Sequence, residues 1–561
     1  MYIDIASIRY RYRGEFDSTQ TYVERDVVRI GHSAFVYQSG NFEKFLPGVA
    51  DADSIGELLV RGETGVKGVR DQHLYLNSSG EPEFKQSLRR NGTTVQSLFP
   101  NMCRTHGFGR WSTHYYSHFL MTDGTVRGLG YNGNGELGDG TTASRTFPSY
   151  TAFPKGITIK GGHDGMHQAY YIDQDDRLWG SGESNYVGQG VTGDVLLPHL
   201  MNGTGDLPAD AKIIDVGSCH DWRGAATSYC ITSDYKLYLW GWQDEGRIGN
   251  GQTSGYQAYP YTPPSLEGLE IEKCFMGGGE RAATYAITRD GILYTAGHSE
   301  TALHGVQKTS FEKFMPWHLY DETIKVVHIS VNEAYSHTRA TYYSVVTVTL
   351  SNGNYYWRSN GVNNSAPGFT DQTYSRPIAF YGEENTNVKE AYAKHGDYMQ
   401  HIVLKNDGSI WQKGYGGHYA IRGGDASTWV QLNLPTGEYA TKIQCCGGVY
   451  NYVAGILTNN GKLYFWGRTQ LGQEGNGFTN TDNFVTVQRD PTVYPTPVLS
   501  EETFIDFQFC GYAGNDGGDY NALGVRALSD KNEAWTWAAG NYGMNNDDDG
   551  EWRSVPHKII F

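Results

Sequence analysis

Residues 442–467 read KIQCCGGVYNYVAGILTNNGKLYFWG, and this stretch decides the fold. Three short segments in it, 442–448, 452–457 and 462–467, are mainly apolar, and the first ends in cysteine and glycine. The Asn460-Gly461 pair separates the last two, and Asn-Gly between strand-like segments is a strong hairpin signal. The stretch therefore predicts three consecutive antiparallel strands. A glycine-rich excursion and a proline-containing segment follow, and they predict a fourth strand at a sheet edge.

The same turn recurs along the chain. Asp123-Gly124, Asp290-Gly291 and Asp407-Gly408 are clear copies of it, and weaker copies bring the number to eight. The turns lie at residues 123, 175, 234, 290, 352, 407, 460 and 530. A repeated unit of three or four antiparallel strands predicts an all-β chain with a β-propeller of seven or eight blades, in which each sheet packs between two neighbours. A solenoid is the alternative architecture.

The repeat also predicts the domain organisation. We expect a small β module at residues 1–50, a connector at 51–98 and the propeller at 99–561. The expected repeat units lie near residues 99–155, 156–211, 212–268, 269–322, 323–384, 385–437, 438–502 and 503–561.

Composition excludes several classes of protein. The 72 glycines, 41 tyrosines, 22 phenylalanines and 13 tryptophans favour turns, strands and a large core, and the net charge of -16 would repel phosphate backbones. We therefore expect no nucleic-acid partner. No long apolar run or secretory signal is present, which predicts no membrane insertion and assembly in a cytoplasm. The seven cysteines are sparse, odd in number and without CxxC spacing, which predicts free, buried thiols.

Two segments resemble a known repeat. Residues 130–141, GYNGNGELGDGT, and 466–472, WGRTQLG, are similar to the repeat of the regulator of chromosome condensation propellers. The resemblance covers residues 99–561 and is strong in units one and seven but degenerate in units four to six. It implies a propeller of that family's kind, which usually has seven blades. The nucleotide-exchange and chromatin roles of the eukaryotic family are not carried over, because the chain is acidic and has no basic tail.

The first hundred residues show a different pattern. Residues 22–38 alternate apolar and polar side chains on both sides of Gly31 and predict a hairpin. They resemble small modules of bacteriophage virion proteins and of some carbohydrate-binding modules. Residues 55–65, IGELLVRGETG, and 74–84, LYLNSSGEPEF, resemble a segment of phage tail-fibre and appendage proteins, with Glu57 in place of its Asp and Phe84 in place of its Trp. This resemblance implies attachment to a virion.

Three motifs suggest ligands but have simpler explanations. The glycines 133, 135 and 138 match a dinucleotide fingerprint, yet no helix is predicted after them, so we interpret them as repeat-turn glycines. Residues 545–551 open like a calcium loop, but Pro556 takes the place of the final Glu, which favours a solvated loop over a cation site. His163 and His167 have a helical metal-ligand spacing in a segment too glycine-rich for a helix.

We therefore expect no metal, no cofactor and no catalytic residues. None of the common nucleophile, zinc or phosphate-loop motifs is complete. Polysaccharide depolymerase activity stays open, because two carboxylates need only meet in space.

The loops that join the first and second strands of each unit are the candidate binding site. Equivalent loops of a propeller converge on one end of its axis, and here they are rich in Trp, Tyr, His, Arg and Asp. Such side chains suit glycan or protein recognition, although they could instead cap strand ends and one another. The candidate ligand-binding residues are Arg104, His106, Arg110, Trp111, His163, Asp164, His167, His220, Asp221, Trp222, Arg223, Arg281, His337, Arg339, His395, Asp397, Tyr398 and Tyr450.

Together these observations predict a bacteriophage virion protein, a tail fibre or tail-associated receptor-binding protein that mediates host adhesion. Residues 1–98 would bind tail or baseplate proteins, and the propeller would bind a host surface glycan or protein. Fibre-type attachment implies a homo-oligomer, with a trimer as the usual form, although no long heptad run specifies one. The alternatives are a capsid decoration or head-fibre protein without receptor binding, and a bacterial propeller that acts as an interaction scaffold.

Overall fold

The chain divides into two compact units, Met1–Gly92 with Ile560–Phe561, and Thr93–Ile559. In the computed structural model the first unit is described by seven strands without their side chains. In the second unit the described residues are 93–100, 116–220, 226–277, 283–298, 310–316, 324–336, 341–359, 381–382, 386–394, 400–414, 426–447, 452–467, 475, 498–512, 522–538 and 553–559. Each unit is considered by itself.

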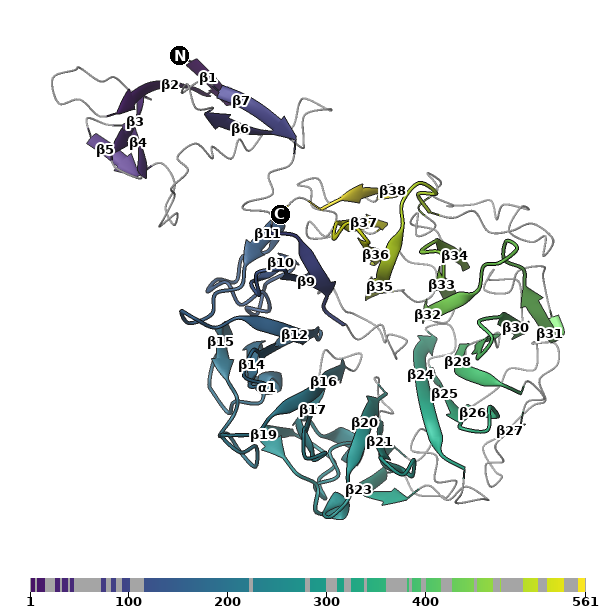
Figure 1. Cartoon of the computed structure of the whole chain (residues 1–561). Helices are drawn as coiled ribbons and strands as arrows, with labels where there is room; N and C mark the ends of the chain where they lie inside the picture. Colours follow the sequence, from purple (N-terminus) through teal and green to yellow (C-terminus); the bar gives the residue numbers. More distant parts are fainter. Residues whose placement is uncertain are drawn as a thin grey trace. The chain divides into compact units, whose positions relative to one another are not determined.

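The second unit is a propeller of eight blades (Figure 1). Blades 1 to 4 consist of β8 (Val95–Leu98), β9 (Tyr116–Met121), β10 (Val126–Gly130), β11 (Arg145–Tyr150); β12 (Ile159–Asp164), β13 (Gln168–Asp173), β14 (Leu178–Gly182), β15 (Val195–Leu200); β16 (Ile213–His220), β17 (Ala226–Thr232), β18 (Leu237–Trp242), β19 (Tyr256–Tyr261); and β20 (Ile271–Met276), β21 (Ala283–Thr288), β22 (Leu293–His298), β23 (Ser310–Pro316).

Blades 5 to 8 follow the same antiparallel order. They consist of β24 (Val326–Ser336), β25 (Thr341–Leu350), β26 (Tyr355–Ser359), β27 (Tyr381–Gly382); β28 (Val388–Lys394), β29 (Gln400–Lys405), β30 (Ile410–Gly414), β31 (Ala426–Leu432); β32 (Ala440–Gly447), β33 (Tyr452–Thr458), β34 (Leu463–Gly467); and β35 (Phe504–Tyr512), β36 (Ala522–Ser529), β37 (Ala534–Ala538), β38 (Arg553–Lys558). In blade 7, Val498 forms an isolated antiparallel bridge with Leu463 of β34. The first strand of each blade lies toward the axis and the fourth toward the rim (Figure 1).

The middle strands explain the long apolar runs of the sequence. Every residue of β13 is buried, because neighbouring blades cover both faces of the sheet. Successive side chains point to opposite blades, so Tyr170 packs toward blade 3 while Tyr171 packs toward blade 1. At the rim, β11 has no fully buried residue. Burial therefore falls from the middle strands to the fourth strand.

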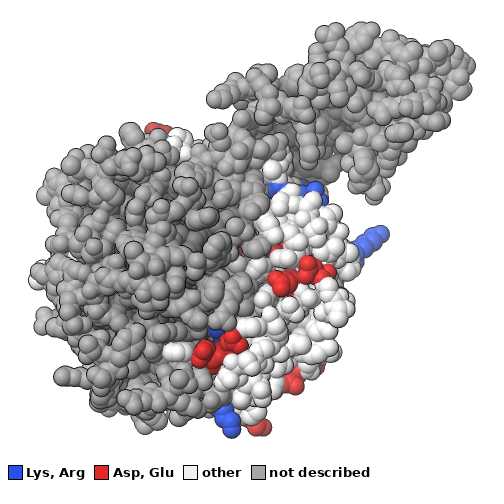
Figure 2. Space-filling view, turned by 180° about the vertical axis from the view of Figure 1, so that it is seen from behind, with Lys and Arg blue, Asp and Glu red and all other residues white. Residues whose placement is uncertain are grey.

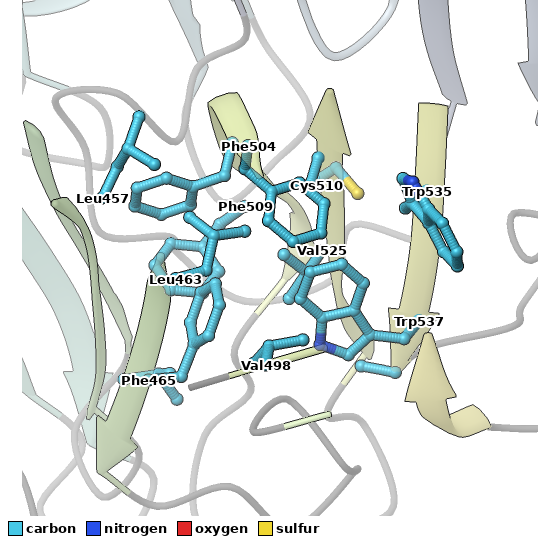
Figure 3. Close-up of a cluster of buried hydrophobic side chains, with 14 of the residues drawn as sticks. Leu457, Leu463, Phe465, Val498, Phe504, Phe509, Cys510, Val525, Trp535 and Trp537 are labelled. Carbon is cyan, nitrogen blue, oxygen red and sulfur yellow. The ribbon is translucent and has the colours of Figure 1, made fainter. Parts of the chain in front are cut away.

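Apolar clusters join the blades. Among the described residues, seven clusters fill the seven consecutive interfaces from blades 1 and 2 to blades 7 and 8. Figure 3 shows the cluster between blades 7 and 8, where the Phe465 ring lies edge-on to Phe509 and Trp537 with centroid distances of 5.7 Å. Burying a large apolar side chain stabilises a fold by about 1.5–3 kcal/mol. The interfaces are thus the main source of the propeller's stability.

A ring of hydrogen bonds closes the propeller. The turn between the second and third strands of each blade contains one residue with a left-handed φ, between 59° and 85°, and its carbonyl accepts a hydrogen bond from the first strand of the next blade. The donor and acceptor pairs are Ile159 and Gly124, Ile213 and Asp176, Ile271 and Tyr235, Val326 and Gly291, Val388 and Gly353, Ala440 and Gly408, Phe504 and Gly461, and Val95 and Asn532. The last pair joins blade 8 to blade 1 with an N···O distance of 3.2 Å. The eight predicted units are therefore eight blades in a closed ring, and the solenoid alternative is wrong.

The propeller begins before the predicted residue 99. Val95 and Leu98 are buried in β8, the innermost strand of blade 1, and the compact unit starts at Thr93. This strand is only four residues long, so the turn-based repeat pattern did not include it.

The first unit contains a five-stranded sheet and a hairpin. The sheet has the order β1 (Tyr2–Ile5), β2 (Ile8–Glu15), β3 (Asp26–Ile30), β4 (Ser33–Gln38), β5 (Asn41–Lys44), and only β2 and β3 run parallel among its pairs. β3 and β4 pair from Val27–Val36 to Ile30–Ser33, which confirms the hairpin predicted around Gly31. β6 (Gln72–Leu76) and β7 (Pro82–Gln86) form the separate hairpin.

The described cysteines are free and buried, as predicted. Cys219, Cys274, Cys446 and Cys510 lie in first strands, close to the axis. Burial raises the pKa of the Cys274 and Cys510 thiols, which makes them poor nucleophiles. In the described part of the chain, no helix has the length and apolar character needed to cross a membrane.

Candidate functional site

Antiparallel strands place the connections of each blade at two opposite ends of the propeller. We call the end with the second-to-third-strand turns the turn end, and the end with the first-to-second and third-to-fourth loops the loop end. The structure describes few of the predicted ligand-binding residues, and those belong to the loop end. The structure describes the side chains of three of them, His163, Asp164 and His167, and the backbone of His220 at the end of β16. The other predicted residues lie outside the described part of the chain.

Asp164 is the centre of a buried polar network. Its Oδ1 lies 2.6 Å from His118 Nδ1, and its Oδ2 accepts a hydrogen bond from the His118 backbone N–H at 2.9 Å. The Asp164 side chain is 4% exposed and the His118 side chain is 0% exposed. On the other side of the ring, His118 Nε2 lies 3.2 Å from the Tyr171 hydroxyl, which lies 3.1 Å from Ser181 Oγ. The network joins blade 1 to blade 2.

This hydroxyl, imidazole and carboxylate series is not a catalytic site. Burial raises the pKa of the Tyr171 hydroxyl far above its ordinary value, and Ser181 is completely buried. A nucleophile must reach its substrate, and these groups are buried between the two blades. The sequence pattern did not identify His118, because nothing in its surroundings marks it and its partner is 46 residues away.

His163 joins blade 2 to blade 3. Its Nε2 accepts a hydrogen bond from the Ser218 backbone N–H at 3.1 Å and lies 3.0 Å from Ser218 Oγ. The residue is 6% exposed, so most of its surface is committed to this interface. His163 and His167 have different partners, and among the described residues no group of three or more metal-ligating side chains comes together.

His167 lies at a seam between loops of blades 1 and 2. The Asn134 side-chain amide donates to its Nδ1 at 3.1 Å, and Glu183 Oε2 lies 3.6 Å from the same nitrogen. Asn134 also donates to Glu136 through its backbone N–H and its side chain, both at 2.9 Å. Burial raises the pKa of the Glu136 carboxyl to about 8, and the charge of Asp194 adds to the rise. Burial, followed by Asp194, also raises the pKa of Glu183.

The third-to-fourth-strand loops of blades 1, 2 and 3 have three different structures. Residues 131–144 form an irregular loop held by Asn132, which donates to Asp139 at 3.1 Å and accepts from the Leu137 N–H at 2.9 Å. Residues 183–194 contain the helix α1 (Ser184–Val187), and residues 243–255 contain the short 3-10 helix η3 (Asp244–Gly246). The dinucleotide-like glycines belong to the first loop, which has no helix, as predicted.

Among the described residues that Figure 2 shows, charged side chains form no broad area of one sign. The described residues there are mostly uncharged, with small separate groups of acidic and basic side chains. A phosphate backbone is bound by many basic groups acting together, so this view offers no such surface within the described residues.

Comparison with known proteins supports the propeller. The ultraviolet-B receptor UVR8 of Arabidopsis thaliana is 30% identical over 196 residues, which are 34% of this chain and 41% of the receptor. The mitochondrial RCC1 domain-containing protein RUG3 of the same plant is 24% identical over 379 residues, 64% of this chain and 76% of its own. The chain thus spans about two fifths of the first of these relatives. No protein-family model matches it.

Solved structures give weaker likenesses. Human WBSCR16 has a TM-score of 0.46 at 15% identity, and covers 68% of this chain and 95% of its own. Yeast Prp20p has a TM-score of 0.44 at 15% identity, and covers 80% and 88%. The sequence relatives make the second unit an RCC1-like β-propeller, as predicted. Both of those relatives are plant proteins, and neither gives support to a place on a bacteriophage particle.

Proposed function

We propose that this chain is an interaction scaffold without enzymatic activity, whose propeller binds another macromolecule through its loop end. The observation that carries the proposal is the difference in structure between three equivalent loops in consecutive blades, 131–144, 183–194 and 243–255. The fold needs only that each loop joins two neighbouring strands. Loops of a rigid scaffold that vary in this way are where binding residues usually lie.

The buried polar networks support binding rather than catalysis. Asp164 and His163 hold neighbouring blades together, which fixes the strand ends from which the loops start. A rigid base reduces the entropy lost when the loops bind a partner. The carboxylates Glu136 and Glu183 contact Asn134 and His167, so their nearest partners are also protein groups.

Site-specific photo-crosslinking tests the scaffold proposal. A photoreactive amino acid is placed in the full chain at exposed loop-end residues Thr142, Asn185 and Thr253, and at the exposed turn-end residues Lys155, Lys212 and Asn352 as matched controls. After irradiation in lysate of the source cells, we expect discrete adducts from the loop-end probes and none from the controls. Equal labelling at both ends, or none at either, would contradict the proposal.

A second candidate function is suggested by residues 55–65 and 74–84, which resemble segments of phage tail-fibre proteins. In this proposal residues 1–98 attach the chain to tail or baseplate proteins of a virion, and the propeller binds a host glycan or protein. Capsid decoration without receptor binding is the variant of this candidate. Its test is antibody labelling of purified particles in the electron microscope. Label at the tail supports adhesion, label on the capsid supports decoration, and unlabelled particles reject the virion candidate.

A further inference from the structure

Two aromatic side chains meet at the loop end of blade 3. Trp242 is the last residue of β18 and Tyr256 the first of β19, and they are directly opposite in the register of the two strands. Their ring centroids are 4.7 Å apart with an interplanar angle of 65°. Tyr256 is 43% exposed, so a large part of its ring faces solvent. The indole Nε1 of Trp242 has no hydrogen-bond acceptor in the described part of the chain.

Blade 2 holds this pair in place. Tyr186, in α1, is buried and its ring centroid lies 5.7 Å from that of Tyr256. The ring of His167 lies in turn 5.8 Å from Tyr186. The helix ends at Gly188, whose left-handed φ of 82° and close approach to Trp240 leave no room for a side chain. The exposed Tyr256 ring is therefore supported by two blades and is fixed before any ligand binds.

Hydrogen-bonded amide side chains adjoin the aromatic pair in the chain, Gln243 after Trp242 and Gln257 after Tyr256. Asn250 Nδ2 donates to Gln243 Oε1 at 2.7 Å and to Gln257 Oε1 at 3.3 Å, and Gln243 donates to the Ser254 carbonyl at 2.6 Å. These bonds order the loop 243–255, which leads directly into Tyr256. On the blade 2 side, Asn185 is exposed and Glu183 keeps a quarter of its side chain exposed. Hydroxyl groups of a ligand would thus find both donors and acceptors.

The local charge narrows the class of ligand. The only basic residue in loops 183–194 and 243–255 is Arg247, which is 1% exposed and donates to the Asp244 carbonyl at 2.9 Å. The same loops contain Glu183, Asp194, Asp244 and Glu245. Within these two loops, a sulfated, sialylated or uronic-acid glycan would meet carboxylates without an exposed compensating cation. The platform therefore suits an uncharged ligand.

We infer that Tyr256 and Trp242 form a platform for a neutral sugar, with the pyranose ring stacked on Tyr256 and its hydroxyls bonded to the amides and to Glu183. Aromatic faces pack against the C–H groups of sugar rings, and planar amides and carboxylates satisfy the hydroxyls. The inference rests on the proposed use of the loop end for binding and adds the ligand class.

Binding of the full chain to immobilised oligosaccharides tests the inference. The panel contains neutral glucose, galactose, mannose and N-acetylglucosamine oligomers and their sialylated or uronate-containing counterparts, and calorimetry follows with the best binder. We expect binding to neutral members, a loss of at least about tenfold in affinity for Tyr256→Ala, and retention in Tyr256→Phe. The matched control is Tyr439→Ala, which removes a tyrosine that is 49% exposed at the turn end and should bind as the parent chain does.

Three outcomes would overturn the inference: unchanged binding by Tyr256→Ala, binding to acidic glycans alone, or binding to no sugar. Thermal unfolding of each variant shows whether it is folded, and Tyr256→Phe preserves the ring if Tyr256→Ala does not fold. The scaffold proposal is judged separately by the crosslinking probes. Loop-end adducts without sugar binding would leave the scaffold intact and reject the sugar platform.

Discussion

At the turn end of the propeller all eight blades make the same turn, and its carbonyl accepts a hydrogen bond from the first strand of the next blade. At the loop end, three consecutive blades instead form an irregular loop, an α-helix and a 3-10 helix. The hydrogen bond at the turn end joins backbone atoms, so residues of several types can take the turn position. Five turns have glycine at the left-handed position, and Asp176, Tyr235 and Asn532 take that position in the others. The repeated backbone hydrogen bond thus holds the ring of blades together, whereas the structure of the loops can differ from blade to blade.

Asp164 is an exception to this difference, because it lies at the loop end but stabilises the contact between two blades. Asp164→Ala leaves the buried His118 N–H and ring without their acceptor, and we expect a loss of about 3–5 kcal/mol in the free energy of unfolding. Denaturant unfolding measures the effect. The control is Asp194→Ala at an exposed loop position, which should change stability little. A loss below about 1 kcal/mol for Asp164→Ala would show that the network contributes little to the stability of the fold.

Gly353 sharpens the comparison at the turn end. Its φ is 80°, and an added Cβ would lie 2.7 Å from the backbone N and Cα of Asn387, which cannot move without breaking the contact between blades 5 and 6. Gly353→Ala should therefore destabilise the chain by about 2 kcal/mol. The matched change is Asp176→Gly at the equivalent turn, which should cost less than about 1 kcal/mol. Thermal unfolding of both variants measures the difference, and equal effects would show that the turn geometry does not matter.

Glu136 makes the loop end sensitive to pH. Its folded pKa of about 8 is above its ordinary value of 4.5, so its stabilising contribution is complete below pH 4.5 and is lost as the pH rises toward 8. Glu136→Gln keeps a neutral side chain at every pH. The stability of the parent chain minus that of this variant should therefore fall between pH 4.5 and 8, because groups that do not interact with Glu136 contribute equally to both chains. A flat difference would show that Glu136 titrates near its ordinary value.

Tyr256 should have the smallest effect on stability. Its ring is 43% exposed but packs against Trp242 and Tyr186, so Tyr256→Ala should lower the free energy of unfolding by only about 1 kcal/mol. Phe465→Ala, which empties a position between blades 7 and 8, is the contrasting change and should cost about 3–5 kcal/mol. Similar losses for the two variants in denaturant unfolding would show that Tyr256 stabilises the fold as much as a core residue does.

The sequence predicts the turn end well because its signals are local. Asp-Gly and Asn-Gly pairs mark most turns, and regular spacing identifies those without glycine, such as the turn at Asp234. The buried networks of the loop end could not be predicted in the same way. Asp164 and His163 were candidate ligand-binding residues, and the structure shows that both are buried against neighbouring blades. Their partners are distant in sequence, and only the packing of blades brings them together.

The predicted ligand-binding role of the loop end stays a prediction. Among the described candidates, His167 lies beside Glu183, which keeps a quarter of its side chain exposed. Tyr256 was not predicted as a site residue, because it follows the third-to-fourth-strand loop and the prediction considered only the first-to-second-strand loops. A search for exposed aromatic residues at both sets of loops would have found it.

Hydrogen–deuterium exchange of the eight interblade amides tests the closed ring most directly. These amides belong to Val95, Ile159, Ile213, Ile271, Val326, Val388, Ala440 and Phe504. Mass spectrometry with fragmentation at residue resolution should find all eight strongly protected, with Val95 slowed like the rest because Asn532 of blade 8 accepts its hydrogen bond. Fast exchange at Val95 alone would mean that blades 1 and 8 do not join, and would contradict the closed eight-bladed ring.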